Sequence, residues 1–178
     1  ALLYGYVNDV KEENNLFWLG TGDEGLVRYK DNTAQATYRP EGPNSNTSYR
    51  LRIFGNKLYM LPGGRWATQN MRMGEIMIYE NGSWTNIKNG TLVEQLGNIP
   101  VYDIMNVAQD PNDSKHYFVT TFGTGMLEMQ GEKVVKHYTP NNSNLIAAAP
   151  DNPALYTRTD GIMYDDKGNL WILNTGNS

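Results

Sequence analysis

The sequence predicts an all-β fold made of repeated units, and three observations support this prediction. First, a glycine and a later aromatic or apolar residue stand 13 positions apart in Gly25–Tyr38, Gly74–Ile87 and Gly125–Tyr138. Second, the first and third of these stretches align without a gap at an offset of 100 residues. Third, short apolar and aromatic runs alternate with Gly, Asn, Asp and Pro, whereas no long segment keeps the apolar period of a helix.

The spacing of the apolar runs indicates the type of repeat. The anchor residues Phe17, Tyr59, Tyr117 and Trp171 lie 42, 58 and 54 residues apart. Self-similarity at this period is typical of repeat architectures, and a four-stranded propeller blade takes about 40–50 residues. We therefore predict a β-propeller segment with about three four-stranded blades and part of a fourth. The predicted blades comprise residues 1–44, 45–97, 98–145 and, incomplete, 146–178.

A closed propeller has roughly four to eight blades, so this segment is expected to need further strands. Exposed sheet edges recruit other strands. We therefore expect the partners of this chain to be the remaining blades of a longer parent protein or another copy of itself.

The elements follow from turn residues and apolar runs. In the first blade, the expected strands are Ala1–Val10, Leu16–Gly20, Leu26–Tyr29 and Ala34–Tyr38. The second strand of each blade is apolar on both faces, as in a strand buried between two layers. These inner strands are predicted at 16–20, 58–61, 117–121 and 170–173. We expect the four anchor residues on them to be buried, and a short helical turn to form near residues 92–96.

The offset of 100 residues makes a geometric prediction. Gly25 and Gly125 should occupy equivalent hairpin positions with a backbone conformation that favours glycine. Residues 17–40 and 117–140 should then form the same pair of hairpins.

One hairpin is longer than its counterparts. The distance from Tyr59 to Gly74 is 15 residues, whereas the corresponding distance is 8 residues in the first and third repeats, so seven extra residues lie within 62–73. Binding residues are common on long loops of a rigid scaffold, and Trp and Arg often anchor interfaces. We therefore predict a ligand- or partner-binding site at Arg65, Trp66 and Arg72. The alternative is a loop that only packs against the neighbouring blade.

Composition excludes several classes of function. The chain has 178 residues, 15 Lys and Arg, 19 Asp and Glu and a formal charge of −4, which gives no electrostatic footprint for nucleic acid. It has no cysteine, which removes disulfides and thiolate chemistry. Its longest apolar run, Leu145–Ala149, is far shorter than the roughly 20 residues of a membrane helix. No nucleic-acid partner and no membrane contact are expected.

Three motifs suggest chemistry at first sight, and each has a simpler interpretation. Gly20–Gly25 matches GxGxxG, but a strand follows it where a dinucleotide site needs a helix, which favours a hairpin. Asp165–Asn169 lacks the closing carboxylate of a calcium loop and is interpreted as a turn. His116 and His137 have no serine or carboxylate at a recognisable spacing and are interpreted as surface or half-buried strand residues. We therefore predict no catalytic residue, no metal ligand and no cofactor.

Two segments resemble the two-component regulator propeller repeat, whose pattern is roughly D-x-x-G-N-L-W-I-G-T-x-x-x-G-L-x-R-Y. They are Asn15–Tyr29 (NLFWLGTGDEGLVRY) and Asp165–Ile172 (DDKGNLWI). The chain departs from the pattern at Leu61–Gly63 and at Leu173–Asn174. The third copy, from Asp110 to Ser143, also resembles propeller components of type IX secretion. The resemblance implies a periplasmic or cell-surface location.

The resemblance implies two functions. The first is a non-catalytic sensor module of a hybrid two-component histidine kinase, which binds a ligand such as an oligosaccharide and relays a signal across the membrane. The alternative is a scaffold or interaction propeller of a secretion or surface-assembly system. A third class, a glycosidase or lyase on a propeller rim, needs facing carboxylates, and the sequence shows no such pairing. This segment is therefore predicted not to be an enzyme, even if its parent protein is a histidine kinase.

Overall fold

The computed structural model describes residues 6–22, 24–66 and 68–176. The chain divides into two compact units, residues 1–42 and residues 43–178, which are treated separately below. Neither of the two helices within the described residues has the length or hydropathy to cross a membrane.

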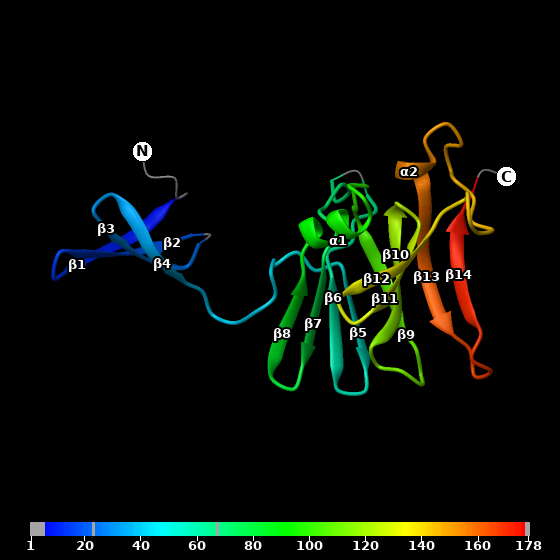
Figure 1. The fold of residues 1–178 in the computed structure, drawn as a ribbon, viewed down its shortest axis with the longest axis horizontal. Helices are drawn as coiled ribbons and strands as arrows, with labels where there is room; N and C mark the ends of the chain where they lie inside the picture. Colours follow the sequence, from blue (N-terminus) through cyan, green and yellow to red (C-terminus); the bar gives the residue numbers. More distant parts are fainter. Residues whose placement is uncertain (1–5, 23, 67, 177–178) are drawn as a thin grey trace. The chain divides into compact units, whose positions relative to one another are not determined.

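The first unit is a single antiparallel sheet whose strands follow one another in chain order (Figure 1). Its strands are β1 (Val7–Glu13), β2 (Leu16–Thr21), β3 (Leu26–Lys30) and β4 (Thr33–Tyr38). The predicted first strand extends further than expected, to Glu13 instead of Val10, and its predicted start at residues 1–5 lies outside the described residues.

The second unit begins with another four-stranded antiparallel sheet in chain order. Its strands are β5 (Arg50–Phe54), β6 (Lys57–Leu61), β7 (Ile76–Glu80) and β8 (Ser83–Ile87). The helix α1 (Asn89–Gln95) follows and buries Leu92, which accounts for the helical turn expected there.

The rest of the second unit forms the third sheet. Four strands again pair in chain order, namely β9 (Ile104–Gln109), β10 (His116–Gly123), β11 (Met126–Gln130) and β12 (Lys133–Tyr138). After α2 (Pro153–Tyr156), a second hairpin is formed by β13 (Thr157–Tyr164) and β14 (Leu170–Thr175). This hairpin joins β10 at the pairs Phe122↔Arg158 and Gly123↔Thr157, which gives a six-stranded sheet.

The all-β fold class is therefore confirmed, with three antiparallel sheets of four, four and six strands that are not closed within the described residues. The succession of meanders is propeller-like. The number of blades and their predicted limits stay a prediction.

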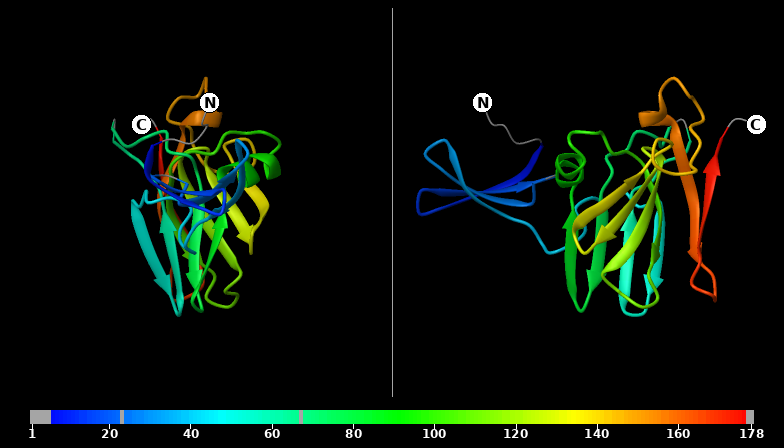
Figure 2. Two further views of the ribbon diagram at one scale, coloured as in Figure 1. Left: turned by 90° about the vertical axis from the view of Figure 1, so that its left-hand side faces the viewer. Right: turned by 45° about the vertical axis from the view of Figure 1, so that its right-hand side comes forward.

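The second unit has two apolar cores, and Figure 2 shows the strands β9–β12 beside the sheet β5–β8 that shares the larger core with them. The larger core joins the sheets β5–β8 and β9–β12, and its centre is the ring contact of Tyr59 with Tyr117, with centroids 5.3 Å apart. The smaller core joins Phe118 and Met126 of the sheet β9–β12 to Ile162 of β13. The sheet β9–β12 thus has both faces covered, which explains why its two strands β9 and β10 are the most buried ones.

The predicted equivalence of Gly25 and Gly125 is confirmed. Their φ angles are 84° and 91°. The register agrees residue by residue, because Leu26 pairs with Tyr38 and Met126 pairs with Tyr138, and the two hairpins carry a bulge at the same place.

The turns before these glycines are also the same. In both turns a threonine, Thr21 or Thr121, donates its backbone N–H (3.0 Å) and its hydroxyl (2.9 Å) to the glycine carbonyl. The hydroxyl accepts the N–H of the residue before the glycine, Glu24 or Thr124. The sequence repeat at an offset of 100 residues is therefore also a repeat of backbone structure.

The second copy of the 13-residue spacing has a different origin. The turn pairs Glu80↔Ser83 and Lys30↔Thr33 correspond at an offset of 50, which places Glu75, and not Gly74, at the position of Gly25. The hairpins β3–β4 and β11–β12 each contain a bulge, which adds one residue, whereas β7–β8 has none. The spacing from Gly74 to Ile87 is therefore also 13 residues, although Gly74 lies one position before the residue that corresponds to Gly25. The expected match at Gly74 was therefore wrong by one position.

The predicted inner strands exist as β2, β6, β10 and β14, but the predicted burial of their anchors is wrong for two of them. Tyr59 and Tyr117 are 0% and 1% exposed, whereas Phe17 and Trp171 are 40% and 63% exposed. Trp171 shares its face of the hairpin β13–β14 with the opposed Met163, and within the described residues no sheet covers that face. Phe17 lies in the sheet β1–β4, and among the described residues of its unit no second layer covers this sheet.

The anchors also differ in the direction of their side chains. Tyr59 points from its sheet toward β9–β12, while Tyr117 points back toward β5–β8, since the two rings meet. Tyr59 therefore corresponds to Phe118, which points onward to β13, and not to Tyr117. A shift by one residue moves a side chain to the other face of a strand.

Candidate functional site

The inserted hairpin, residues 62–73, connects β6 to β7 and is fixed by Asp103. Both oxygens of the Asp103 carboxylate accept backbone N–H groups, from Met71 and Arg72, at 2.9 Å each. The Asp103 N–H donates in turn to the carbonyl of Arg72 at 2.9 Å. Burial raises the pKa of Asp103, against the opposing effect of the two N–H donors.

Glycine is required within this hairpin. Gly64 has φ +147°, and a Cβ placed there would collide with the carbonyl oxygen of Gln69. The hairpin is thus a packed element of the second unit, which agrees with the structural alternative stated above. This packing is compatible with binding, because it holds the outward side chains in place.

The structure brings two of the three predicted site residues together. Arg65 lies with its guanidinium carbon 5.7 Å from the ring centres of both Trp66 and Phe122, and its Nη1 lies 3.2 Å from Oδ2 of Asp160. Trp66 is 64% exposed. Arg72 is directed elsewhere, because its Nη1 donates to the carbonyl of Pro62 at 2.8 Å and so closes the hairpin on itself.

A cavity of about 360 Å³ opens beside Arg65 and Trp66. The hairpin forms one wall, and the other wall comes from the end of β10 and from the segment α2–β13. Its lining includes Asp103, Phe122, Tyr156 and Arg158. Cavities of this size, with aromatic walls and a few polar groups, are typical small-molecule sites.

Phe122, Tyr156 and Arg158 were missed by the sequence analysis. They join the hairpin only because β13 pairs with the end of β10, at Phe122↔Arg158. Only the aromatic and cationic character of these residues gave any signal in the sequence. The binding role of the predicted site stays a prediction.

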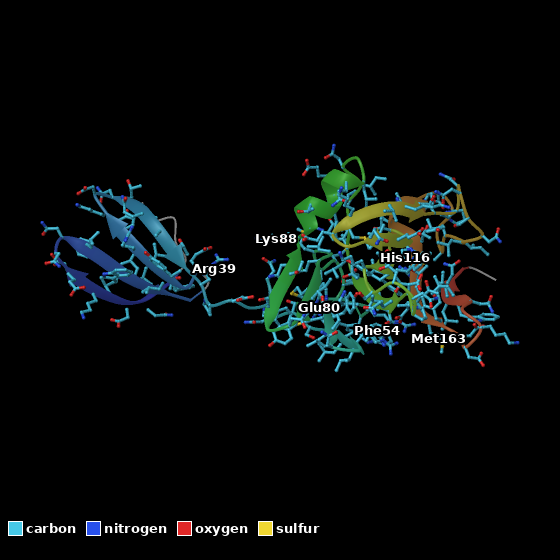
Figure 3. All side chains as sticks on the ribbon, turned by 60° about the horizontal axis from the view of Figure 1, so that its bottom comes forward. Arg39, Phe54, Glu80, Lys88, His116 and Met163 are labelled. Carbon is cyan, nitrogen blue, oxygen red and sulfur yellow. The ribbon has the colours of Figure 1, made fainter. Side chains whose placement is uncertain are left out.

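A second polar cluster surrounds His116, which Figure 3 labels. Its Nδ1 lies 2.9 Å from Oδ2 of Asp110, and its Nε2 lies 2.9 Å from Oε1 of Glu128. The Tyr138 hydroxyl donates to the other Glu128 oxygen at 2.7 Å. The prediction of a half-buried strand histidine is correct, but the sequence spacing concealed both carboxylates, which reach His116 from the residue after β9 and from β11.

The carboxylates determine the charge of this histidine. Both ring nitrogens face acceptors, and only the imidazolium can donate from both. The hydrogen bond to Asp110 and then that to Glu128 raise the pKa of His116, while the hydrogen bond from His116 lowers the pKa of Asp110. Burial opposes ionisation of Glu128, but the hydrogen bonds from Tyr138 and His116 outweigh it and lower the pKa. Burial first, and then the hydrogen bond to Glu128, raise the pKa of Tyr138 to about 12.

We expect this cluster to make stability depend on pH. The stabilisation by His116 is fully present below its ordinary pKa of 6.5 and is lost as the pH rises through the higher folded-state pKa. The stabilisation by Asp110 and Glu128 is present above their ordinary values of 3.8 and 4.5 and is lost on acidification. The cluster should therefore contribute most to the free energy of unfolding between the ordinary pKa of Glu128, 4.5, and that of His116, 6.5.

Urea unfolding of wild type and His116→Gln checks this expectation. The difference in the free energy of unfolding should be larger near pH 5.5 than near pH 8.5, at about 1.4 kcal/mol per unit of pKa shift at most. His137→Gln is the control, because its Nε2 faces the carbonyl of Thr124 and not a carboxylate. An equal difference at both pH values would contradict the expectation.

A groove of about 410 Å³ lies near this cluster. It is lined by Phe54 and Met163, which Figure 3 labels, and by Asp110. Its walls are mostly apolar side chains from β5, β9 and β13.

Comparison with known proteins found no matching family model and no matching curated protein. Among solved structures, the chain is similar to PorZ of Porphyromonas gingivalis, an essential bacterial surface component of the type IX secretion system. The two are 31% identical with a TM-score of 0.75, and the match covers 94% of this chain and 23% of PorZ. A second likeness, to the extracellular domain of the hybrid two-component system BT3049 of B. thetaiotaomicron, has 19% identity and a TM-score of 0.44, and covers 97% of this chain and 20% of that one.

PorZ is a surface component of type IX secretion, which is one of the two groups that the repeat motif suggested. The resemblance predicted from the sequence is therefore confirmed, and the likeness to PorZ carries it. The chain spans less than a quarter of the length of PorZ.

Proposed function

We propose that this chain is a non-catalytic module of a bacterial cell-surface protein that acts as a scaffold in type IX-like secretion. The observation that carries the proposal is the likeness to PorZ, at 31% identity over 94% of the chain. Among the two functions that the repeat resemblance implies, it favours the secretion scaffold.

The architecture supports a scaffold. The second unit stacks its sheets through apolar cores that hold the outward loops rigidly. The face of β13–β14 with Met163, Trp171 and Leu173 is apolar and 63–72% exposed, which suits a further layer from the parent chain or another copy. Arg65 and Trp66 offer a second contact for a partner or ligand, at the cavity that Arg158 of β13 also lines.

A sensor module of a two-component system is the second candidate. The segments Asn15–Tyr29 and Asp165–Ile172 favour it through their resemblance to the regulator propeller repeat. In that case the module binds a ligand, such as an oligosaccharide, in the periplasm and relays a signal.

Deletion of the parent gene in its host distinguishes the two functions. For a secretion scaffold, we expect exported proteins to be lost from the cell surface and to accumulate in the periplasm, as measured by surface proteolysis and cell fractionation. Restoring the gene should restore display. Normal display combined with a lost transcriptional response to a saccharide would reject the scaffold and favour the sensor.

A further inference from the structure

Arg158 lies in the wall of the 360 Å³ cavity without a charged partner among the described residues. Its guanidinium carbon is 4.9 Å from the ring centre of Phe122 and 5.2 Å from that of Tyr156. Its Nε is buried and has no hydrogen-bond acceptor in the described part of the chain. A guanidinium has five N–H donors, and leaving such donors unpaired at a buried position is costly.

The nearby carboxylates are already committed. Asp160 is shared by Arg50 and Arg65, at 3.4 and 3.2 Å. Asp103 uses both oxygens for backbone N–H groups of the hairpin. These two carboxylates therefore leave Arg158 without a neutralising partner, and the cavity carries an excess of positive charge.

Arg158 itself supplies one unpaired positive charge, which indicates the kind of ligand. A guanidinium matches a carboxylate through two parallel hydrogen bonds. A phosphate carries more negative charge than one guanidinium balances. A single carboxylate is therefore the group that best complements Arg158.

The aromatic residues indicate what the carboxylate is attached to. Trp66 stands at the cavity with most of its side chain exposed, and Arg65 lies over its ring and so limits its orientation. An exposed indole fixed beside a polar cavity suits the apolar face of a sugar ring. Phe122 and Tyr156 flank Arg158 and hold its guanidinium in the cavity wall.

We propose that this cavity binds a sugar acid, with its carboxylate on Arg158 and its ring against Trp66. This inference goes beyond the proposed function and stands whether the parent protein serves secretion or sensing, because it depends only on the second unit.

The test is a titration of the parent protein with glucuronate, galacturonate and N-acetylneuraminate, followed by NMR of the indole N–H groups, with the signal of Trp66 assigned by Trp66→Phe. We expect at least one of these acids to shift the Trp66 signal saturably and neutral glucose to bind at least about tenfold more weakly. Inorganic phosphate is a further probe, and stronger binding of phosphate than of every sugar acid would overturn the assignment of a carboxylate.

Variants locate the contact. Arg158→Gln should weaken binding of the sugar acid at least about tenfold and remove the preference over glucose, and Arg158→Lys should recover only part of it. Trp66→Ala should weaken the acid and glucose alike. Met73→Ala is the matched control, since Met73 lies in the same hairpin, is 61% exposed and does not line the cavity.

Thermal unfolding of each variant shows whether the fold is kept. If no sugar acid binds, or if the folded Arg158→Gln protein binds the acids as tightly as wild type, the proposal is wrong. If Met73→Ala weakens binding of the sugar acid as much as Trp66→Ala does, this cavity is likewise rejected as the site.

Discussion

Replacing Tyr117 with alanine should lower the free energy of unfolding of the second unit by about 3–5 kcal/mol. The ring of Tyr117 is 1% exposed and lies between two sheets, where it meets the ring of Tyr59. Its hydroxyl donates to the carbonyl of Gly131 at 2.7 Å, so the substitution also removes a buried hydrogen bond. Because domains of this size are stable by only about 5–15 kcal/mol, this loss is a large part of the total.

Urea unfolding followed by circular dichroism measures the effect, with Trp171→Ala as the control. Trp171 was assigned to the same repeat position from the sequence, but it is 63% exposed. Its replacement should cost about 1 kcal/mol or less, although its indole donates to Asp165. Similar losses for Tyr117→Ala and Trp171→Ala would show that the core between the two sheets does not carry the stability of this unit.

The contrast between these two aromatic residues also shows what the sequence could predict. Local signals placed the strands β2, β6, β10 and β14 correctly, because Gly, Asn and Asp determine where a short strand must turn. The sequence did not show which side chains of each strand are directed to which face of the sheet. The inner strands carry apolar residues on both faces, so their pattern has no period of two, and a displacement by one residue, as at Tyr59, leaves the pattern unchanged.

Exposure was misjudged for a related reason. Whether Phe17 or Trp171 is buried depends on a second layer against its sheet, and an apolar residue looks the same in the sequence whether or not that layer is present. Tyr59 and Tyr117 are buried because the sheets β5–β8 and β9–β12 stack, so that each sheet covers one face of the other.

The candidate site was predictable only in part. The length of the hairpin 62–73 identified it as an insertion, and Arg65 and Trp66 do line a cavity. Arg72 has the same chemistry but turns inward to the carbonyl of Pro62, a choice that the local sequence does not encode. Arg158 comes from another hairpin, and only the pairing of β13 with β10 brings it to the cavity.

Gly125→Ala is expected to be the most damaging glycine substitution in the repeat hairpins. Gly125 has φ +91°, and a Cβ there would collide with the Tyr138 carbonyl oxygen, at 2.3 Å. A left-handed conformation costs an alanine roughly 1–2 kcal/mol, and a forced backbone shift adds about 1–3 kcal/mol. We therefore expect a loss of about 3 kcal/mol or more.

The position of Gly125 in the hydrogen-bond network increases the effect. Its N–H donates to the carbonyl of Thr157 at 2.8 Å, and its carbonyl accepts from Thr121 and from the hydroxyl of Thr159. These bonds connect the turn before β11 to β13, so a displaced Gly125 backbone weakens the attachment of β13. Hydrogen exchange should accordingly show faster exchange of the amides of β13 in the variant than in wild type.

Gly131→Ala separates the effect of the close contact from that of the backbone conformation. Gly131 lies in the turn of the same hairpin with φ +59°, and a Cβ there would meet no atom within 4 Å. Gly131→Ala should lower the free energy of unfolding by only about 1–2 kcal/mol, and Gly131→Asn should lower it less, because asparagine tolerates this conformation. Urea unfolding of the three variants beside wild type measures the difference. If Gly125→Ala and Gly131→Ala are equally stable, the approach of Gly125 to Tyr138 is not what requires glycine in this repeat, and the shared geometry of Gly25 and Gly125 would reflect backbone conformation alone.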